Sequence, residues 1–375
     1  MNQLNRRRFL QTAGLLGTAL LANGSGALAQ SGPGSQPQKI HGVNLGGWLV
    51  LEKWIKPGLF EGQTAEDEYT LCQALGKEKA TALLKEHRDT WITADDFKWL
   101  KARGINSVRL PVGYWVAEEN SPFITGLETM DWAFRTARAN GISVLLDLHG
   151  APGSQNGWDH SGRAGEIGWY QTPENIAHTL RVIEDLAAHC KQYDNLLGIE
   201  LLNEPRDSVP LSILKSYYQE GYQRIRRHLE PTDAAVVIHD SFRPFEWDKF
   251  MPAADYKNVI LDTHLYQCFS DADKKRDMHA QLEVAAVERK QQLDRMSQQL
   301  PCMVGEWSLG LPGESMEGLD KLQRDAAMRG FGAAQLLSYE GTRGWYFWCY
   351  RTQEGGGWSF RDCVKRGWLP DTFGV

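Results

Sequence analysis

The stretch Leu196-Leu197-Gly198-Ile199-Glu200-Leu201-Leu202-Asn203-Glu204-Pro205 is a short, mainly apolar run that ends in an amide, a carboxylate and a proline. A run of this length is typical of a strand that is buried on both faces of a parallel sheet. A similar run, Pro301-Cys302-Met303-Val304-Gly305-Glu306-Trp307, also ends close to a glutamate. Two strands of one parallel sheet would bring both carboxylates to the same edge.

Short apolar or β-branched runs alternate with longer amphipathic stretches from about residue 40 onward. This alternation is typical of β/α units around a parallel sheet. Candidate strands lie at 41–46, 107–112, 143–149, 196–203, 235–240, 258–265, 301–306 and 344–349. Eight parallel strands close a barrel. The sequence therefore predicts an α/β fold, a single (β/α)8 TIM barrel with elaborated βα loops over residues 40–375.

Apolar spacing and helix boundary residues predict helices between these strands. Helices are expected at 94–103 and 173–193, and the polar stretch 277–299 is expected to form an exposed outer helix. Segments 56–80 and 151–171 are rich in glycine and in polar or aromatic residues, so we expect long loops there. Long loops on a compact barrel usually carry binding residues.

Polar and aromatic residues cluster near the carboxyl ends of the expected strands, at the face where barrel enzymes keep their active sites. These residues are Asn44, Glu52, Arg109, Asp147, His149, Asn203, Glu204, His264, Tyr266, Glu306 and Trp348. Each one alone could be structural: Arg109 could form a buried ion pair, and either histidine could be a satisfied core residue. Their joint placement favours a functional site.

Glu204 and Glu306 are the candidate catalytic pair. A glycosidase needs two carboxyl groups, one to give and take a proton and one to attack the sugar or activate water. Carboxyl groups about 5 Å apart support a retaining mechanism, and wider gaps support an inverting one. The chain also has 14 Trp, and indoles can stack on sugar rings. Carbohydrate hydrolysis is therefore the leading hypothesis.

Composition limits the possible partners. Hydrophobic residues are 42% of the chain and charged residues 23%, as in a soluble globular protein. The formal net charge is −6, and removal of residues 1–29 would lower Lys+Arg from 41 to 38 against 47 Asp+Glu. This acidic balance argues against nucleic acid or an anionic membrane surface as a partner. We expect a monomer.

Metal or cofactor chemistry is disfavoured. The six cysteines form no C-x-x-C pair, and we expect buried free thiols. A metal hydrolase is the chemical rival, with possible ligands Asp147, His149, His239, Asp240, Asp262 and His264. The sequence has no H-E-x-x-H motif. We therefore expect neither a metal nor a cofactor.

An ordered set of motifs resembles glycoside hydrolase family 5, and within it the exo-β-1,3-glucanase branch. The motifs are GVNLGGWLVLE (42–52), GINSVRLPV (104–112), LDLHGAPGSQNG (146–157), NEP (203–205), THLYQ (263–267), VGEW (304–307) and GWYFW (344–348). The NEP motif alone is only moderately specific, whereas the ordered set covers nearly all of the chain after residue 40.

The resemblance implies a (β/α)8 barrel and retaining double displacement without a cofactor. It implies that Glu204 is the acid/base and Glu306 the nucleophile. The remaining roles are that Asn203 binds the sugar 2-hydroxyl, Arg109 and Tyr266 keep Glu306 ionised, His149 and His264 border the −1 subsite, and Trp348 forms its stacking floor. An arginine beside Glu306 should lower its pKa, and the surroundings of Glu204 should raise the pKa of the acid.

Residues near the entrance relate to substrate choice. The resemblance implies that Glu52 hydrogen-bonds the sugar at the non-reducing end and that Trp158 and Phe269 form an aromatic clamp. Asp159 is also a candidate substrate-binding residue. The family typically has Phe at both clamp positions, so Trp158 is a departure that bears on linkage preference.

We expect the substrate to be a β-glucan or β-glucoside, and the expected activity is exo-acting release of glucose from β-1,3-glucan. The alternatives with the same chemistry are a β-1,6-glucanase, an endo-β-1,4-glucanase and a glucosidase for small glucosides. A catalytically silent glycan-binding protein is a further alternative. Such a protein would be expected to lose an acid, yet Glu204, Glu306, Arg109 and Asn203 are all present.

The N-terminus predicts export. Arg6-Arg7-Arg8 precedes a modest apolar run, and Ala27-Leu28-Ala29 follows it. This pattern is typical of a twin-arginine signal peptide over residues 1–29, followed by a flexible leader at 30–39 and a periplasmic or extracellular destination. We expect N-terminal sequencing of the exported protein to begin at Gln30. A mature protein that still begins at Met1 would contradict the signal assignment.

Overall fold

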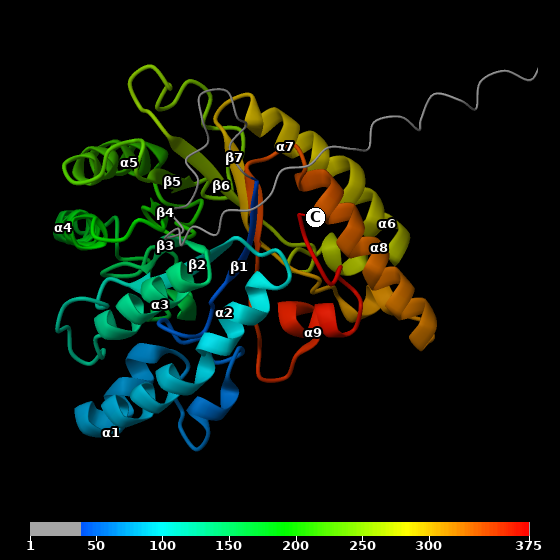
Figure 1. Ribbon diagram of the computed structural model, residues 1–375, viewed down its shortest axis with the longest axis horizontal. Coiled ribbons are helices and arrows are strands. Elements are labelled where there is room, and N and C mark those ends of the chain that lie inside the picture. The colour runs from blue at the N-terminus through cyan, green and yellow to red at the C-terminus, as the bar shows by residue number, and fades with distance from the viewer. Residues whose placement is uncertain (1–38, 375) are drawn as a thin grey trace, which may run out of the picture. The chain divides into compact units, whose positions relative to one another are not determined.

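The computed structural model describes residues 39–374. Eight parallel strands form a closed barrel in chain order, so each strand pairs with its neighbours in sequence and β8 closes on β1 (Figure 1). The strands are β1 (Ile40–Asn44), β2 (Ser107–Gly113), β3 (Ser143–Gly150), β4 (Leu196–Glu200), β5 (Ala235–His239), β6 (Val259–Leu265), β7 (Cys302–Trp307) and β8 (Gly344–Phe347). The predicted barrel and all eight predicted strand positions are confirmed. The predicted signal peptide and residues 30–38 of the leader lie outside the described residues.

Helices cover the outside of the barrel (Figure 1). The α-helices are α1 (Glu68–Trp91), α2 (Ala94–Lys101), α3 (Leu127–Ala139), α4 (Pro173–Cys190), α5 (Leu211–Arg226), α6 (Met278–Glu283), α7 (Arg289–Ser297), α8 (Lys321–Tyr339) and α9 (Phe360–Lys365). The predicted helix at 277–299 corresponds to α6, a π-helical segment (Val284–Glu288) and α7. Among the described residues, no helix is both long and apolar enough to cross a membrane.

The prediction of a long loop over 56–80 is wrong in its second half. A 3-10 turn covers Pro57–Phe60, and α1 begins at Glu68. Asp67 caps this helix because its Oδ1 accepts a hydrogen bond from the Thr70 backbone N–H at 2.7 Å. Gly76 has φ +72° and interrupts the helical geometry, which explains why the helical pattern is weak in the sequence.

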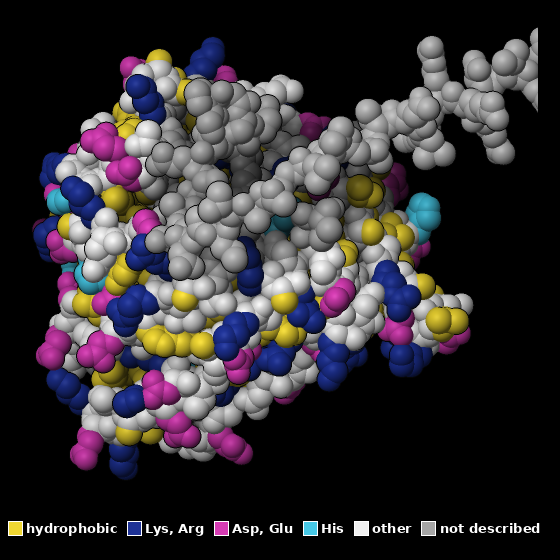
Figure 2. Space-filling view, viewed as in Figure 1, with side chains coloured by type: hydrophobic (Ala, Val, Ile, Leu, Met, Phe, Trp, Pro, Cys, Tyr) yellow, Lys and Arg dark blue, Asp and Glu magenta, His cyan; other side chains and the backbone are white. Residues whose placement is uncertain are grey.

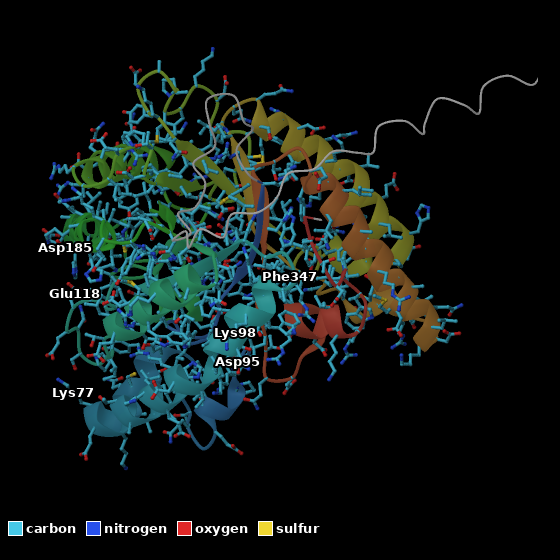
Figure 3. The ribbon with its side chains drawn as sticks, viewed as in Figure 1. Lys77, Asp95, Lys98, Glu118, Asp185 and Phe347 are labelled. Carbon is cyan, nitrogen blue, oxygen red and sulfur yellow. The ribbon has the colours of Figure 1, made fainter. Side chains whose placement is uncertain are left out.

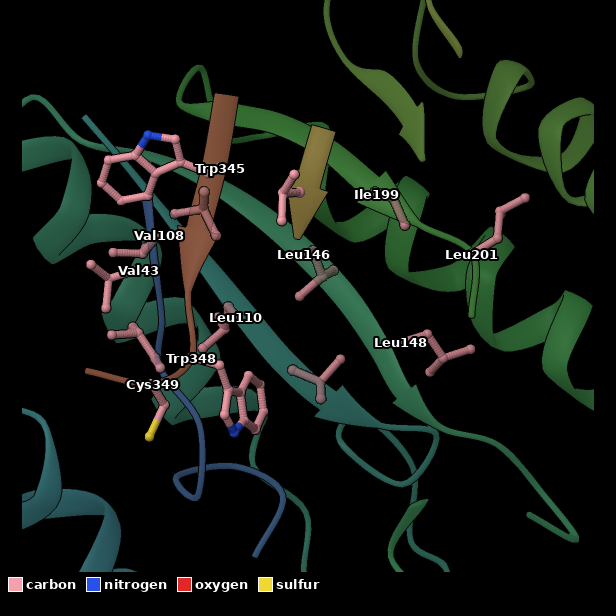
Figure 4. Close-up of a cluster of buried hydrophobic side chains, with 14 of the residues drawn as sticks. Val43, Val108, Leu110, Leu146, Leu148, Ile199, Leu201, Trp345, Trp348 and Cys349 are labelled. Carbon is pink, nitrogen blue, oxygen red and sulfur yellow. The ribbon is translucent and has the colours of Figure 1, made fainter. Parts of the chain in front are cut away.

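Along β2, alternation separates apolar side chains of the outer shell from polar side chains that face the barrel interior. Val108, Leu110 and Leu146 belong to the large apolar cluster that extends to the surrounding helices (Figure 4). Ser107 and Arg109 alternate with Val108 and Leu110 along β2. The Ser107 hydroxyl lies 2.8 Å from the Tyr346 hydroxyl, and Arg109 is fully buried. The interior therefore accommodates charge only where it is paired.

Surface charges are interspersed rather than grouped by sign on the described part of the face shown in Figure 2. Lys98 and Asp95, both labelled on α2 in Figure 3, illustrate this arrangement. Their Nζ and Oδ1 atoms lie 2.8 Å apart, and both side chains are largely exposed. Such pairs contribute little to stability.

The six cysteines are free, and five of them are buried.

Candidate active site

A cavity of about 940 Å³ opens at the carboxyl ends of the strands. Ten of the twelve predicted site residues line it: Glu52, His149, Trp158, Asp159, Glu204, His264, Tyr266, Phe269, Glu306 and Trp348. The other two, Arg109 and Asn203, are fully buried and contact residues of this group. The structure therefore brings the predicted residues together in one place.

His264 connects the two candidate catalytic carboxylates. Its Nδ1 lies 2.6 Å from Glu204 Oε1 and 3.3 Å from Glu306 Oε2. These two carboxylate oxygens are consequently no more than about 6 Å apart, which fits the spacing of about 5–5.5 Å in retaining glycosidases better than the wider inverting spacing. A register shift between β6 and β7 places His264 beside Glu306.

The backbone holds each glutamate differently. Glu306 belongs to β7, whereas Glu204 lies beyond the end of β4 with φ +44°. A non-glycine residue in this left-handed region carries local strain that the surrounding structure must support. Support comes from Ser241, whose Oγ donates to the Pro205 carbonyl at 2.8 Å. The neighbouring Asn203 N–H donates to the Leu148 carbonyl at 2.9 Å.

Arg109 lies beneath the cavity, and each of the three nitrogens of its guanidinium group contacts an acidic residue. Its Nη1 is 3.0 Å from Glu306 Oε1, its Nε is 2.8 Å from Glu200 Oε2, and its Nη2 is 3.2 Å from Asp147 Oδ2. Asn203 Oδ1 accepts a further hydrogen bond from Nη2 at 2.8 Å. One planar fork thus links residues of three strands and the segment after β4.

Both oxygens of Glu306 receive hydrogen bonds. Arg109 contacts Oε1, and the Tyr266 hydroxyl donates to Oε2 at 2.8 Å. Hydrogen bonds and positive charge both favour the ionised carboxylate. They also fix the orientation of the carboxylate in the cavity.

The order of the two glutamate pKa values differs from the predicted order. Burial raises the pKa of Glu306 to about 8, against the opposing effects of His264, Arg109 and Tyr266. Burial also opposes ionisation of Glu204, but the hydrogen bond and charge of His264 outweigh it and lower the pKa of Glu204 to about 2. The expectation of a raised Glu204 pKa and a lowered Glu306 pKa is therefore wrong for the unliganded site, because His264 lies closer to Glu204. Because the two carboxyl groups interact, together they hold one proton at pH values between about 2 and about 8.

A second histidine forms part of the cavity wall. His149 Nδ1 lies 2.6 Å from Asp147 Oδ2, and its ring is parallel to that of Trp348 with centroids 5.5 Å apart. Burial and the nearby Arg109 lower the pKa of His149 well below its ordinary value. His149 is therefore neutral and is held in a fixed orientation beside the Trp348 indole.

The other predicted binding residues lie nearer the entrance. Glu52 is buried and accepts a hydrogen bond from Trp54 Nε1 at 2.9 Å, while burial and Asp159 raise its pKa well above its ordinary value. Phe269 is 66% exposed and packs edge-on against Tyr266. Trp158 is partly buried and packs against other neighbours, among them Arg206, whose Cζ lies 4.5 Å from the indole centroid.

Several residues of the site are not among those predicted from the sequence. Trp54, His160, Arg206, Phe242 and Trp358 also line the cavity. They belong to loops or short 3-10 turns, where no periodic pattern indicates which way a side chain points. Glu200 was missed for another reason, because it lies inside the apolar run that defines β4. The signal that could have identified Glu200 is an acidic residue inside a strand that is otherwise apolar and buried.

Two groups of described residues have the spacing of metal ligands, namely Glu204, His239 and His264, and Glu200, Asp262 and His264. Each group contains only two of the six residues of the metal hydrolase alternative. Both depend on His264, which already contacts Glu204. The geometry thus gives this alternative little support.

Comparisons with known proteins agree with this geometry. Residues 73–353 match the model of the cellulase family, glycosyl hydrolase family 5. The chain is 39% identical to a glucan 1,3-beta-glucosidase of Blumeria graminis, with 89% of this chain and 87% of that protein covered. It is 38% identical to a probable glucan 1,3-beta-glucosidase A of Emericella nidulans, with 89% and 90% covered. The crystal structure of rutinosidase from Aspergillus niger shares the fold, with a TM-score of 0.74 and 22% identity over 88% of this chain and 97% of that one.

Replacing Arg109 by lysine should destabilise the protein. An ammonium group cannot contact Glu200, Asp147, Glu306 and Asn203 simultaneously, so buried acids lose their partner. We expect R109K to lower the free energy of unfolding by about 3 kcal/mol. Denaturant unfolding at neutral pH measures this change. The matched control is R103K, at a partly exposed arginine that stacks on Trp99, and an equal loss in both variants would contradict the special role of Arg109.

Proposed function

The chain belongs to glycosyl hydrolase family 5 and is a glycosidase, and we propose that it is a retaining, exo-acting β-1,3-glucanase that releases glucose from glucan. The observation that carries this proposal is the contact of His264 with both Glu204 and Glu306, which holds two carboxylates within about 6 Å at the mouth of the barrel. The names of the relatives with 35–39% identity support the β-1,3 linkage.

Double displacement assigns a separate task to each glutamate. With substrate bound, the one proton that the pair holds lies on Glu204, which leaves Glu306 as the carboxylate. In the first step Glu306 attacks the anomeric carbon and forms a glycosyl ester, while the glycosidic C–O bond breaks and Glu204 gives this proton to the departing oxygen. In the second step Glu204 takes a proton from water, and the hydroxyl oxygen replaces Glu306 at the anomeric carbon. The two inversions together retain the β configuration. A sugar hydroxyl in place of water would give transglycosylation.

The donors around Glu306 support its role as nucleophile. Arg109 and Tyr266 contact one carboxylate oxygen each and stabilise the negative charge until attack. In the described structure Glu204 forms no hydrogen bond with Arg109. It lies instead between His264 and His160. Glu204 therefore exchanges its proton beside two imidazoles, away from the buried guanidinium that holds Glu306.

The remaining site residues suit a sugar in the −1 subsite. We assign Asn203 to the sugar 2-hydroxyl, Glu52 to the hydroxyls of the non-reducing end and Trp348 to the floor of the subsite. The raised pKa of Glu52 makes its carboxyl able to donate as well as accept. His149, His264 and Asp159 border the same region. No group in this scheme requires a metal or cofactor.

We assign Trp158 and Phe269 to a clamp on the next sugar. Both rings line the cavity, and an aromatic surface suits the C–H face of a glucose unit. Exo action on a β-1,3 linkage depends on how these loops close the cavity. The β-1,6, endo-β-1,4 and small-glucoside alternatives would use the same two glutamates and differ only in these contacts.

We further propose that residues 1–29 direct export by the twin-arginine pathway, and that the mature protein acts as a monomer outside the cytoplasm. The Arg-rich start and the Ala27-Leu28-Ala29 sequence support export. The substrate is consistent with this location, because a glucan polymer is too large to enter a cell intact.

The earliest product should be β-glucose. We expect proton NMR of the mature protein acting on β-1,3-glucan to show the β-anomeric signal first, followed by mutarotation. The variant E306A should lose hydrolysis but still bind glucan, which a pull-down with insoluble glucan can measure. Early α-glucose would contradict retention, and a ladder of oligosaccharides would contradict exo action. Hydrolysis that survives E306A would contradict the proposed mechanism.

Activity should depend on the single proton that the glutamate pair holds. Above a pH of about 8 the pair loses this proton, and the leaving oxygen is no longer protonated. At low pH the pair takes up a second proton, and no nucleophile remains. We expect kcat/KM on β-1,3-glucan to fall on both flanks, with the alkaline limb near pH 8. A flat profile from pH 4 to 9 would contradict the assignment.

A further inference from the structure

Glu204 lies between two imidazoles. His264 Nδ1 is 2.6 Å from Oε1, as described above, and His160 Nε2 is 3.4 Å from the other oxygen, Oε2. His160 also lines the cavity, and its ring lies 5.3 Å from the ring of His149. The contact between His160 and Glu204 is independent of the Arg109 network.

The loop after β3 holds His160 firmly. His160 is the central residue of a 3-10 turn, Asp159–Ser161, and the Ser161 Oγ donates to the Trp158 carbonyl at 2.7 Å. The Gly162 carbonyl accepts a hydrogen bond from the Tyr69 backbone N–H at 2.9 Å, which ties this loop to α1. A side chain on such a braced turn can hold a partner in a fixed geometry.

His160 is neutral in the free site. Burial lowers its pKa to about 4, against the opposing effect of Glu204, while His149 and His264 add to the lowering. A neutral imidazole has one N–H and one acceptor nitrogen. In one tautomer Nε2 can accept from protonated Glu204, and in the other Nε2–H can donate to the carboxylate. The other ring nitrogen, Nδ1, has no hydrogen-bond partner in the described part of the chain.

We propose that His160 is a positioning residue for the acid/base Glu204. It fixes Oε2 of Glu204 in both half-reactions, as acceptor when Glu204 is the acid and as donor when Glu204 is the base. This inference rests on the proposed function, because it assigns proton transfer to Glu204. The proposal predicts that replacing His160 slows the first step more for a leaving group that must be protonated than for one that departs without a proton.

Leaving-group dependence tests this proposal. A sugar hydroxyl departs only with a proton, whereas 2,4-dinitrophenolate departs without one. We expect H160F to lower kcat/KM about ten-fold on a β-1,3-linked disaccharide of glucose and to change kcat/KM on 2,4-dinitrophenyl β-glucoside by less than about two-fold. For the aryl glucoside, kcat/KM reports the first step alone, so the later base role of Glu204 does not enter.

Two further variants complete the test. H160Q keeps one donor and one acceptor and should retain more disaccharide activity than H160F, and it carries the test alone if H160F does not fold. H279F changes an exposed histidine on α6 and should leave both substrates unaffected. An equal loss on both substrates in the His160 variants would indicate a structural or binding role and overturn the proposal. No loss on either substrate would also overturn it.

The same assays separate this proposal from the proposed function. Wild-type protein that cleaves the aryl glucoside and a differently linked disaccharide, but not the β-1,3-linked one, would refute the linkage. The ratio of losses in H160F would then be measured on the disaccharide that the protein cleaves. That ratio still confirms or refutes the role of His160.

Discussion

The fork of hydrogen bonds made by Arg109 is the constraint on which the rest of the site depends. A fully buried guanidinium is tolerated only when nearby acids and amides satisfy it. Here Asp147 on β3, Glu200 on β4 and Glu306 on β7 are the acidic partners. Asn44 on β1 accepts a further hydrogen bond from Nη1 at 3.0 Å. These contacts join distant strands inside the barrel, so the position of Glu306 follows from the closure of the barrel itself.

An excess of buried acid around one arginine explains the protonation behaviour of the site. Burial raises the pKa of Glu200 to about 8 and that of Asp147 to about 7, although Arg109 acts against both shifts. Burial also opposes charge on His264, but Glu306, Asp262 and Glu204 outweigh it and raise the pKa of His264 well above its ordinary value. A second positive charge therefore forms between the two catalytic candidates. The position of this charge, rather than the identity of either glutamate, determines which of the two holds the proton in the unliganded site.

The sequence predicted the barrel well because buried parallel strands appear as nearly continuous apolar runs, and these runs are bounded sharply. It predicted Glu204, Glu306 and Arg109 because strand ends converge at one face. It could not predict α1, whose pattern is interrupted at Gly76, or the orientation of His160 and Trp358, which depends on loop conformation. The order of the two glutamate pKa values could not be predicted from the sequence either. It depends on the distances from His264 to the two carboxylates, which differ by less than an ångström.

The two glutamates are supported by different parts of the fold, and this difference suits their chemistry. In the proposed mechanism Glu306 must remain in place while its charge is consumed and restored, and Arg109 holds it from within the barrel. The same mechanism requires Glu204 to exchange a proton twice in each cycle, and its neighbours are the imidazoles of His264 and His160. His160 comes from a loop that approaches β3 so closely that a Cβ on Gly150 would lie 2.5 Å from the Ser161 carbonyl oxygen. Glycine at position 150 thus allows the loop to reach Glu204, the proposed acid/base, while the barrel below it stays unchanged.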